Sequence, residues 1–242
     1  MIGIILAAGD GTRLKKSSNE DCCKPLTKIN EKSLITYALD NLVQLKIPEA
    51  YIVIGKEGAL IKNVIGNEYN NIKLHYVYQQ EQKGLMNAFM QALNVIDDNE
   101  TVILQLSDEL FVDLKIEAIK NTIEMGKFDF YCGVTYEEDP QKIKNNFSVE
   151  TNDEALLVKC TEKPQVVVNN IKGTGFSVFN GQAQKLIKET YETNPDKLYD
   201  LCDSFNYLVE SGLSGTTFLV AEKEFNINTL SDLTEAESVL KN

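Results

Sequence analysis

Residues 2–14 of the 242-residue chain read IGIILAAGDGTRL. The first seven residues of this stretch are apolar or glycine, which predicts a β-strand buried on both faces of a mostly parallel sheet. Gly9 and Gly11 follow the strand directly, and they allow the backbone to turn sharply and to bring its N–H groups close to an anion. Because ligands of open α/β sheets bind beyond the carboxyl ends of the strands, the stretch predicts a ligand site at its end.

Strand-like and helix-like segments alternate after this stretch. Apolar residues at helical spacing predict a helix that begins near Leu34, with Ser33 as its N-cap. Further strands are expected at residues 50–55, 72–78, 101–106 and 128–135, and further helices at residues 59–65, 85–93 and 114–123. Such alternation is typical of an α/β fold with a doubly wound, mostly parallel (mixed) sheet that helices cover on both faces.

The second half of the chain has a more mixed pattern. A hairpin is expected from residues 147–150 and 155–161, with its turn at Asn152-Asp153. Later strands are expected at residues 174–179 and 216–221, and helices at residues 182–190 and 198–210. Thr229 and Asp232 are a capping pair that opens a final helix. Since no repeat, low-complexity tract or Gly/Ser linker interrupts the chain, we expect one domain, residues 1–242.

Composition and charge limit the classes of partner. Hydrophobic residues make up 43% of the chain and charged residues 25%, as is usual for a soluble globular protein. The formal net charge of −12 disfavours binding to nucleic acid or to an anionic membrane. Residues 10–32 are an exception, because they contain six Lys or Arg and four Asp or Glu. This segment provides the local positive charge that an anionic substrate needs.

The cysteines and the N-terminus predict a cytoplasmic protein. The five cysteines include the adjacent Cys22 and Cys23 and form no CxxC motif, a pattern that favours reduced thiols over a disulfide framework. The apolar N-terminal run is too short for a signal peptide and has no basic residues before it. His75, the only histidine, is expected in the middle of a strand, and we predict a structural role for it.

The stretch LAAGDGTRL, together with Lys24-Pro25-Leu26, resembles the GxGTRL and PKPL signature of the sugar-1-phosphate nucleotidylyltransferases, the NDP-sugar pyrophosphorylases. Other phosphate-binding loops fit less well, because Leu14 replaces the third glycine of a dinucleotide fingerprint and no Gly-Lys-Ser/Thr follows as in a Walker loop. The resemblance implies a small, single-domain member with a Rossmann-like nucleotidyltransferase fold. Residues 1–111 would form a nucleotide-binding half and residues 112–242 an acceptor-binding half.

The resemblance also implies roles for individual residues. Arg13 and Lys24 would be catalytic and would neutralise the phosphates of the nucleotide, although Cys23 stands where the family usually has proline. Gln79, with Gly84 opening the next helix, would read the base, and Gln80 is a neighbouring alternative. The residues implied in nucleotide binding are Leu6, Ala8, Gly9, Gly11, Thr12, Arg13, Lys24, Gln79 and Gly84.

A metal and an acceptor complete the implied site. Asp108, in a segment that resembles the family's LGDNIF, would hold Mg²⁺, because a hard cation prefers carboxylate oxygen. Asn228 would be the second ligand, with Asn226 as an alternative, and Glu109 is expected to be peripheral. In the acceptor half, the resemblance of Thr161-Glu162-Lys163-Pro164 to the EKP segment implies Glu162 and Lys163 as acceptor-binding residues. A later glycine stretch adds Gly175.

The reaction implied is transfer of a nucleotidyl group from a nucleoside triphosphate to a sugar 1-phosphate, with release of pyrophosphate. Because the phosphate of the acceptor is already ionised, it needs no general base to attack the α-phosphorus in line. A cytidylyltransferase for phosphocholine or another alcohol phosphate is an alternative. A non-catalytic subunit that binds nucleotide or sugar and a dinucleotide-dependent oxidoreductase are alternatives from other classes. The sequence does not reveal the base or the oligomeric state.

Overall fold

A computed structural model describes residues 1–18 and 23–240 of the chain, and within them a ten-stranded mixed sheet forms the centre of the fold. Its first half is parallel, in the spatial order β6-β4-β1-β7. These strands are β1 (Ile2–Ala7), β4 (Glu49–Ile54), β6 (Ile72–Tyr78) and β7 (Val102–Leu106). Since β1 is paired on both edges and covered on both faces, its uninterrupted apolar sequence is explained, and the predicted buried strand is confirmed.

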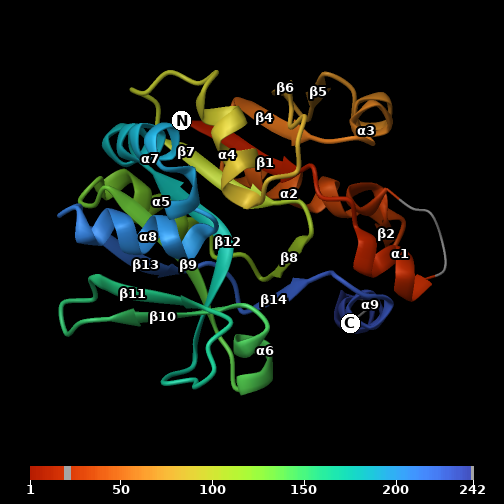
Figure 1. The fold of residues 1–242 in the computed structure, drawn as a ribbon. Coiled ribbons are helices and arrows are strands. Elements are labelled where there is room, and N and C mark those ends of the chain that lie inside the picture. Colours follow the sequence, from red (N-terminus) through yellow and green to blue (C-terminus); the bar gives the residue numbers. More distant parts are fainter. Residues whose placement is uncertain (19–22, 241–242) are drawn as a thin grey trace.

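The second half of the sheet is mixed. Strand β12 (Ile171–Phe179) runs antiparallel to both β7 and β9 (Phe130–Tyr136), and β13 (Gly215–Leu219) runs parallel to β9. The predicted hairpin is confirmed as β10 (Phe147–Thr151) and β11 (Leu157–Glu162). In Figure 1 this hairpin extends away from the parallel strands, and a pairing with β12 connects it to the sheet.

Helices cover both faces of the sheet, as the alternating pattern predicts. Helices α2 (Leu34–Gln44), α3 (Gly58–Ile65) and α5 (Ile116–Met125) bury apolar side chains on one face. Helices α4 (Leu85–Leu93), α7 (Gly181–Thr193) and α8 (Leu201–Glu210) cover the other. The doubly wound α/β architecture is therefore confirmed.

A small two-stranded sheet lies beside the main one and was not predicted. Strand β8 (Glu109–Val112) pairs antiparallel with β14 (Lys223–Asn226), close to α9 (Leu230–Leu240) and to the β2 (Lys28–Ile29) and β3 (Lys32–Ser33) pair (Figure 1). A separate apolar cluster joins these elements, and its buried members are Ile29, Leu34, Leu110, Phe225, Ile227 and Ala236. Four-residue strands have too few alternations to be read from sequence, but this pairing brings residues near 108 and 228 together.

Several short elements also differ from expectation. The segment after Gly11 is the helix α1 (Thr12–Ser18), followed after the undescribed residues by a 3₁₀ turn, η1 (Lys24–Leu26). The helix α6 (Pro140–Lys144), the short strand β5 (Glu68–Tyr69) and the 3₁₀ turn η2 (Pro195–Lys197) were not predicted either. Each has few residues, so its hydrophobic periodicity is weak.

The two predicted helix caps have different outcomes. At α9, the Thr229 backbone N–H donates to Asp232 Oδ2 at 2.7 Å, and the Asp232 N–H donates to Thr229 Oγ1 at 3.3 Å, so the capping pair is confirmed. At α2, Ser33 occupies the N-cap position, but its hydroxyl contacts Thr36 Oγ1 at 2.6 Å and caps no backbone N–H. The prediction for Ser33 is correct in position and wrong in mechanism.

The described cysteines fit the prediction of reduced thiols. Cys132, Cys160 and Cys202 are buried and Cys23 is half-buried, all as free thiols, while Cys22 lies outside the described residues. Of the helices in residues 1–18 and 23–240, none combines the length and the hydropathy that a membrane span requires.

Phe205 on α8 tests the packing of this core. Its ring is fully buried and stacks on Phe130 and Phe179, with ring centroids 5.6 and 5.8 Å away. We expect Phe205→Ala to lower the free energy of unfolding by about 3–5 kcal/mol, because it removes buried area and leaves a cavity. Denaturant unfolding measures this, with Val166→Ala, at a position 73% exposed, as a control that should change it by less than about 0.5 kcal/mol. A loss of similar size in both variants would contradict the packing described.

Candidate active site

A cavity of about 450 Å³ opens at the carboxyl ends of β1 and β7, where the sequence predicts a ligand site. Every residue implied in nucleotide binding lines it: Leu6, Ala8, Gly9, Gly11, Thr12, Arg13, Lys24, Gln79 and Gly84. Asp108 and Asn228 line it as well. Further lining residues that the sequence did not single out include Gln82, Leu85, Ala88 and Tyr199. The parallel sheet therefore gathers segments that are far apart in the chain at one edge.

Gly11 shows why the loop after β1 requires glycine. Its φ of +63° lies in the left-handed region, and a Cβ built there would be 2.7 Å from Lys24 Cβ. The Gly11 carbonyl accepts a hydrogen bond from the Lys15 N–H at 2.9 Å and so begins α1. The glycine thus permits both the turn into the helix and the close approach of Lys24.

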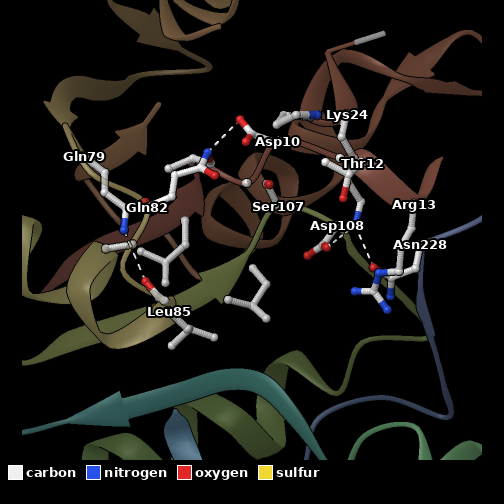
Figure 2. A pocket seen from close by; sticks show the side chains of 18 of the residues that line it. Asp10, Thr12, Arg13, Lys24, Gln79, Gln82, Leu85, Ser107, Asp108 and Asn228 are labelled. Carbon is white, nitrogen blue, oxygen red and sulfur yellow. Dashed lines mark hydrogen bonds and ion pairs between the residues drawn. The ribbon is translucent and has the colours of Figure 1, made fainter. Parts of the chain in front are cut away.

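Lys24 connects three distant segments at one end of the cavity (Figure 2). Its ammonium forms an ion pair with Asp108 and donates a hydrogen bond to Asn228 Oδ1 at 3.0 Å. Only 8% of Lys24 is exposed. Asp108 lies between β7 and β8, and Asn228 lies between β14 and α9. Each residue is therefore next to a strand of the small sheet. The backbone fixes this approach, because the Ile227 N–H donates to the Asp108 carbonyl at 2.9 Å.

The Asp108 and Asn228 side chains fit a divalent cation. Both direct an oxygen at the Lys24 ammonium, so the structure already gathers a carboxylate and an amide oxygen around a positive charge. No group of three or more His, Cys, Asp or Glu side chains suited to a metal occurs in the described part of the chain. Mg²⁺ commonly binds through one or two protein oxygens with water and substrate phosphates completing its shell, so two ligands are enough.

Asn226 has a different position from Asn228. Its Oδ1 accepts a hydrogen bond from Asn228 Nδ2 at 2.6 Å, and its own amide nitrogen donates to Asn146 Oδ1 at 3.2 Å. Asn226 therefore orients Asn228, whose Oδ1 remains on Lys24. This geometry favours Asn228 over Asn226 as the residue that would complete a metal site.

Two glutamines lie at the opposite end of the cavity, away from Lys24 (Figure 2). Gln79 is buried, and its amide nitrogen donates to the Gly84 carbonyl at 3.2 Å and to Asn87 Oδ1 at 3.0 Å. Gln80, the neighbouring alternative, is exposed and does not line the cavity. Gln82 does, and its amide nitrogen donates to the Ala8 carbonyl at 2.8 Å and to Asp10 Oδ1 at 2.7 Å. No sequence signal distinguished Gln82 from the other polar residues of the loop after β6.

A second cavity of about 370 Å³ adjoins the first and shares Arg13 and Asn228 with it. Lys163, implied in acceptor binding, lines this cavity. Glu162 pairs with Lys163 at 3.1 Å but lines neither cavity, and burial is the main cause that raises its pKa. Gly175 lies buried in β12, and its N–H donates to Glu109 Oε2 at 2.7 Å. Of the three residues implied in acceptor binding, the structure therefore places one at a cavity wall.

Glu109 is buried between charged neighbours and lines neither cavity, so its expected place at the periphery of the metal site stays a prediction. Burial, with the negative charges of Glu224 and Asp108, raises its pKa well above the usual value. Lys172 lies nearby and forms a 2.6 Å ion pair with Glu224 Oε2, and Glu137 Oε2 lies 3.9 Å from the same ammonium. Sequence reasoning missed Lys172 and Glu224, because they come from separate strands and neither belongs to a recognisable motif.

His75 has no part in these cavities. Its ring stacks on Tyr51 at a centroid distance of 4.7 Å, and its Nε2 lies 2.5 Å from Glu49 Oε1. The prediction that it is a structural residue agrees with these contacts.

Comparisons with known proteins agree with this geometry. The family model described as Nucleotidyl transferase matches residues 2–238. A UTP–glucose-1-phosphate uridylyltransferase, AglF of Haloferax volcanii, is 27% identical over 242 residues, which cover 100% of this chain and 97% of that protein. The bifunctional protein GlmU of Thermodesulfovibrio yellowstonii is 28% identical over 98% of this chain, which spans about half of that relative (52%).

Solved structures show the same fold. A putative glucose-1-phosphate thymidylyltransferase of Bacillus anthracis, in complex with sucrose, superposes with a TM-score of 0.85 at 20% sequence identity. The superposition covers 100% of this chain and 96% of the Bacillus anthracis chain. The inositol-1-phosphate CTP transferase of T. maritima has a TM-score of 0.80 at 20% identity and covers 99% and 94%. Because the family model spans nearly the whole chain and its signature residues line one cavity, the protein belongs to the nucleotidyl transferase family.

Proposed function

We propose that this nucleotidyltransferase joins a nucleoside triphosphate to a sugar 1-phosphate and releases pyrophosphate, with Mg²⁺ as its cofactor. The contact of Lys24 with both Asp108 and Asn228, beside the glycine loop, is the observation that carries this proposal. It supports a site in which the Lys24 ammonium and a metal held by Asp108 and Asn228 would both contact the phosphates of one bound nucleotide. The relative AglF, a UTP–glucose-1-phosphate uridylyltransferase, supports the acceptor class.

The site is suited to alignment and charge neutralisation. The α-phosphorus would lie between Lys24 and Arg13, which is exposed at the boundary of the two cavities. The acceptor phosphate would enter from the second cavity and attack in line, while pyrophosphate leaves toward the glycine loop. An ionised phosphate is already a nucleophile, so catalysis would depend on holding the two substrates in place and on stabilising the negative charge of the transition state.

Asp108 and Asn228 would hold the metal. Mg²⁺, when bound, supplies positive charge to the triphosphate and orients it. Lys24 would then turn from these two oxygens toward the nucleotide, because its ammonium and the cation compete for the same ligands. An amide ligand carries no charge, so retention of the cation would depend mainly on Asp108 and on the phosphates.

Lys24 and Asp108 provide the first test of this assignment. We expect Lys24→Ala and Asp108→Ala each to lower kcat/KM by about 100- to 1,000-fold, because each removes a charge at the reacting phosphates. Pyrophosphate release, assayed with four or five nucleoside triphosphates against phosphorylated acceptors, measures the effect. Lys28→Ala is a matched control, because Lys28 lies in the same basic segment but is 64% exposed and pairs with Glu31. Near-normal turnover by either site variant would refute the assignment, and absence of pyrophosphate release by the unaltered protein would favour a non-catalytic binding role.

Gln79 tests the direction in which the nucleotide lies. Since its amide nitrogen already donates to Gly84 and Asn87, its amide oxygen is the group available to a donor on the base. We expect Gln79→Ala to raise the KM of the nucleotide about 3- to 10-fold, as for loss of one hydrogen bond, and to leave the KM of the acceptor unchanged. Gln80→Ala, at the exposed neighbouring position, is the control. If Gln79→Ala and Gln80→Ala have the same preference among the nucleoside triphosphates, the base does not contact Gln79.

Asn228 tests the metal site. Asn228→Asp adds a carboxylate ligand, so we expect it to lower the Mg²⁺ concentration that gives half-maximal activity, while Asn228→Ala raises it several-fold. Magnesium titration of the transfer rate after treatment with EDTA measures both effects. Identical titration curves for the three proteins would exclude Asn228 as a ligand.

A further inference from the structure

Glu224, in the lining of the second cavity, has one carboxylate oxygen without a partner. Its Oε2 lies 2.6 Å from Lys172 Nζ, and the two side chains are 1% and 2% exposed. Its Oε1 is buried and finds no hydrogen-bond donor in the part of the chain that the structure describes. A buried oxygen without a donor loses its hydration and gains nothing in return. The pair therefore leaves a position where a donor from a bound molecule would be stabilising.

The second cavity is in the right place for the acceptor of the proposed reaction. It shares Arg13 and Asn228 with the nucleotide cavity, and Asn228 is bonded to Lys24. A molecule whose phosphate lies near Arg13 can therefore extend the rest of its structure into the second cavity, toward Glu224.

The charges around Glu224 favour a neutral donor over a cation. Lys172 already compensates the Glu224 carboxylate, and in the lining of the same cavity Lys142, Lys144 and Lys163 outnumber the carboxylates of Asp232 and Glu235. Quaternary ammonium groups are usually bound against several aromatic faces. Phe225 is the aromatic residue among the described lining residues, and the Lys142 ammonium already lies 5.9 Å from its ring centroid. A hydroxyl group, by contrast, can donate to Oε1 without adding charge.

We propose that Glu224, held in place by Lys172, determines acceptor specificity by accepting a hydrogen bond from a hydroxyl group, so that the cavity selects a polyhydroxylated phosphate over an alkylammonium phosphate. This inference rests on the proposed function, because it concerns the acceptor of the same reaction. It adds the buried ion pair of Lys172 and Glu224 to the residues proposed for acceptor binding, and neither residue belongs to a motif recognised in the sequence.

Glu224→Gln is the decisive variant. Because an ammonium only donates, the new amide would turn its oxygen toward Lys172 and place its NH₂ group at the position of Oε1. The acceptor hydroxyl would then meet a donor instead of an acceptor. We expect the KM of the hydroxylated acceptor to rise about 10- to 100-fold, as for loss of a hydrogen bond to a charged group, with the KM of the nucleotide unchanged. Glu222→Gln is the matched control, since Glu222 precedes β14, is 56% exposed and pairs with Lys115 outside the cavity.

Glucose 1-phosphate, inositol 1-phosphate and phosphocholine serve as probes. Their binding is measured by calorimetry with an α,β-methylene nucleotide present, and their turnover by pyrophosphate release. We expect at least one hydroxylated probe to bind the unaltered protein at least about 10-fold more tightly than phosphocholine, and Glu224→Gln to remove that difference. Equal or tighter binding of phosphocholine, or unchanged acceptor affinity in Glu224→Gln, would overturn the inference.

A substrate-side measurement replaces the variant if Glu224→Gln does not fold. Monodeoxy analogues of the hydroxylated probe that binds are compared on the unaltered protein, and one of them should bind at least about 10-fold more weakly. Equal affinity for all of them would overturn the inference. The two proposals fail separately, because transfer without an effect at Glu224 contradicts only this inference, and selective binding without transfer contradicts only the proposed function.

Discussion

The Lys24 ammonium, shared between Asp108 and Asn228, is the interaction on which the organisation of the site depends. It joins residues that are 84 and 204 positions away in the chain. Removing a lysine and a carboxylate from water is costly, and buried ion pairs often contribute little net stability. In this pair Lys24 is 8% exposed, while the side chain of Asp108 is 25% exposed. The pair is better explained by the phosphates and the cation that the site is proposed to bind.

The surrounding fold makes this contact possible. Strands β1 and β7 run parallel as neighbours, so the glycine loop and Asp108 emerge at the same edge of the sheet. The small β8 and β14 sheet then places Asn228 beside Asp108, and the apolar cluster that includes Leu110, Phe225 and Ile227 holds the two strands against α9. Rigid strands on one side and a packed cluster on the other leave little freedom for the side chains between them.

The same small sheet connects the two cavities. Glu109 on β8 and Glu224 on β14 are buried close to Lys172, and burial raises the pKa of both carboxyl groups. Glu109 also fixes the backbone of β12 through Gly175. Strand β14 thus carries Glu224, which lines the second cavity, and leads to Asn228, which lines both cavities.

The sequence alone determined the α/β fold, the buried first strand, the helices on both faces and many of the residues that line the first cavity. These features follow from local causes: hydrophobic periodicity, the freedom of Gly11, and a signature of adjacent residues from 6 to 26. It did not determine the β8 and β14 pairing, the place of Gln82 in the cavity wall, the burial of Glu109, or the Lys172 and Glu224 ion pair. These depend on contacts between segments far apart in the chain. Such contacts are stabilised by the burial of side chains from both segments and by the pairing of opposite charges across strands. Such contacts exist only once the sheet has formed, and therefore only the tertiary structure decided them.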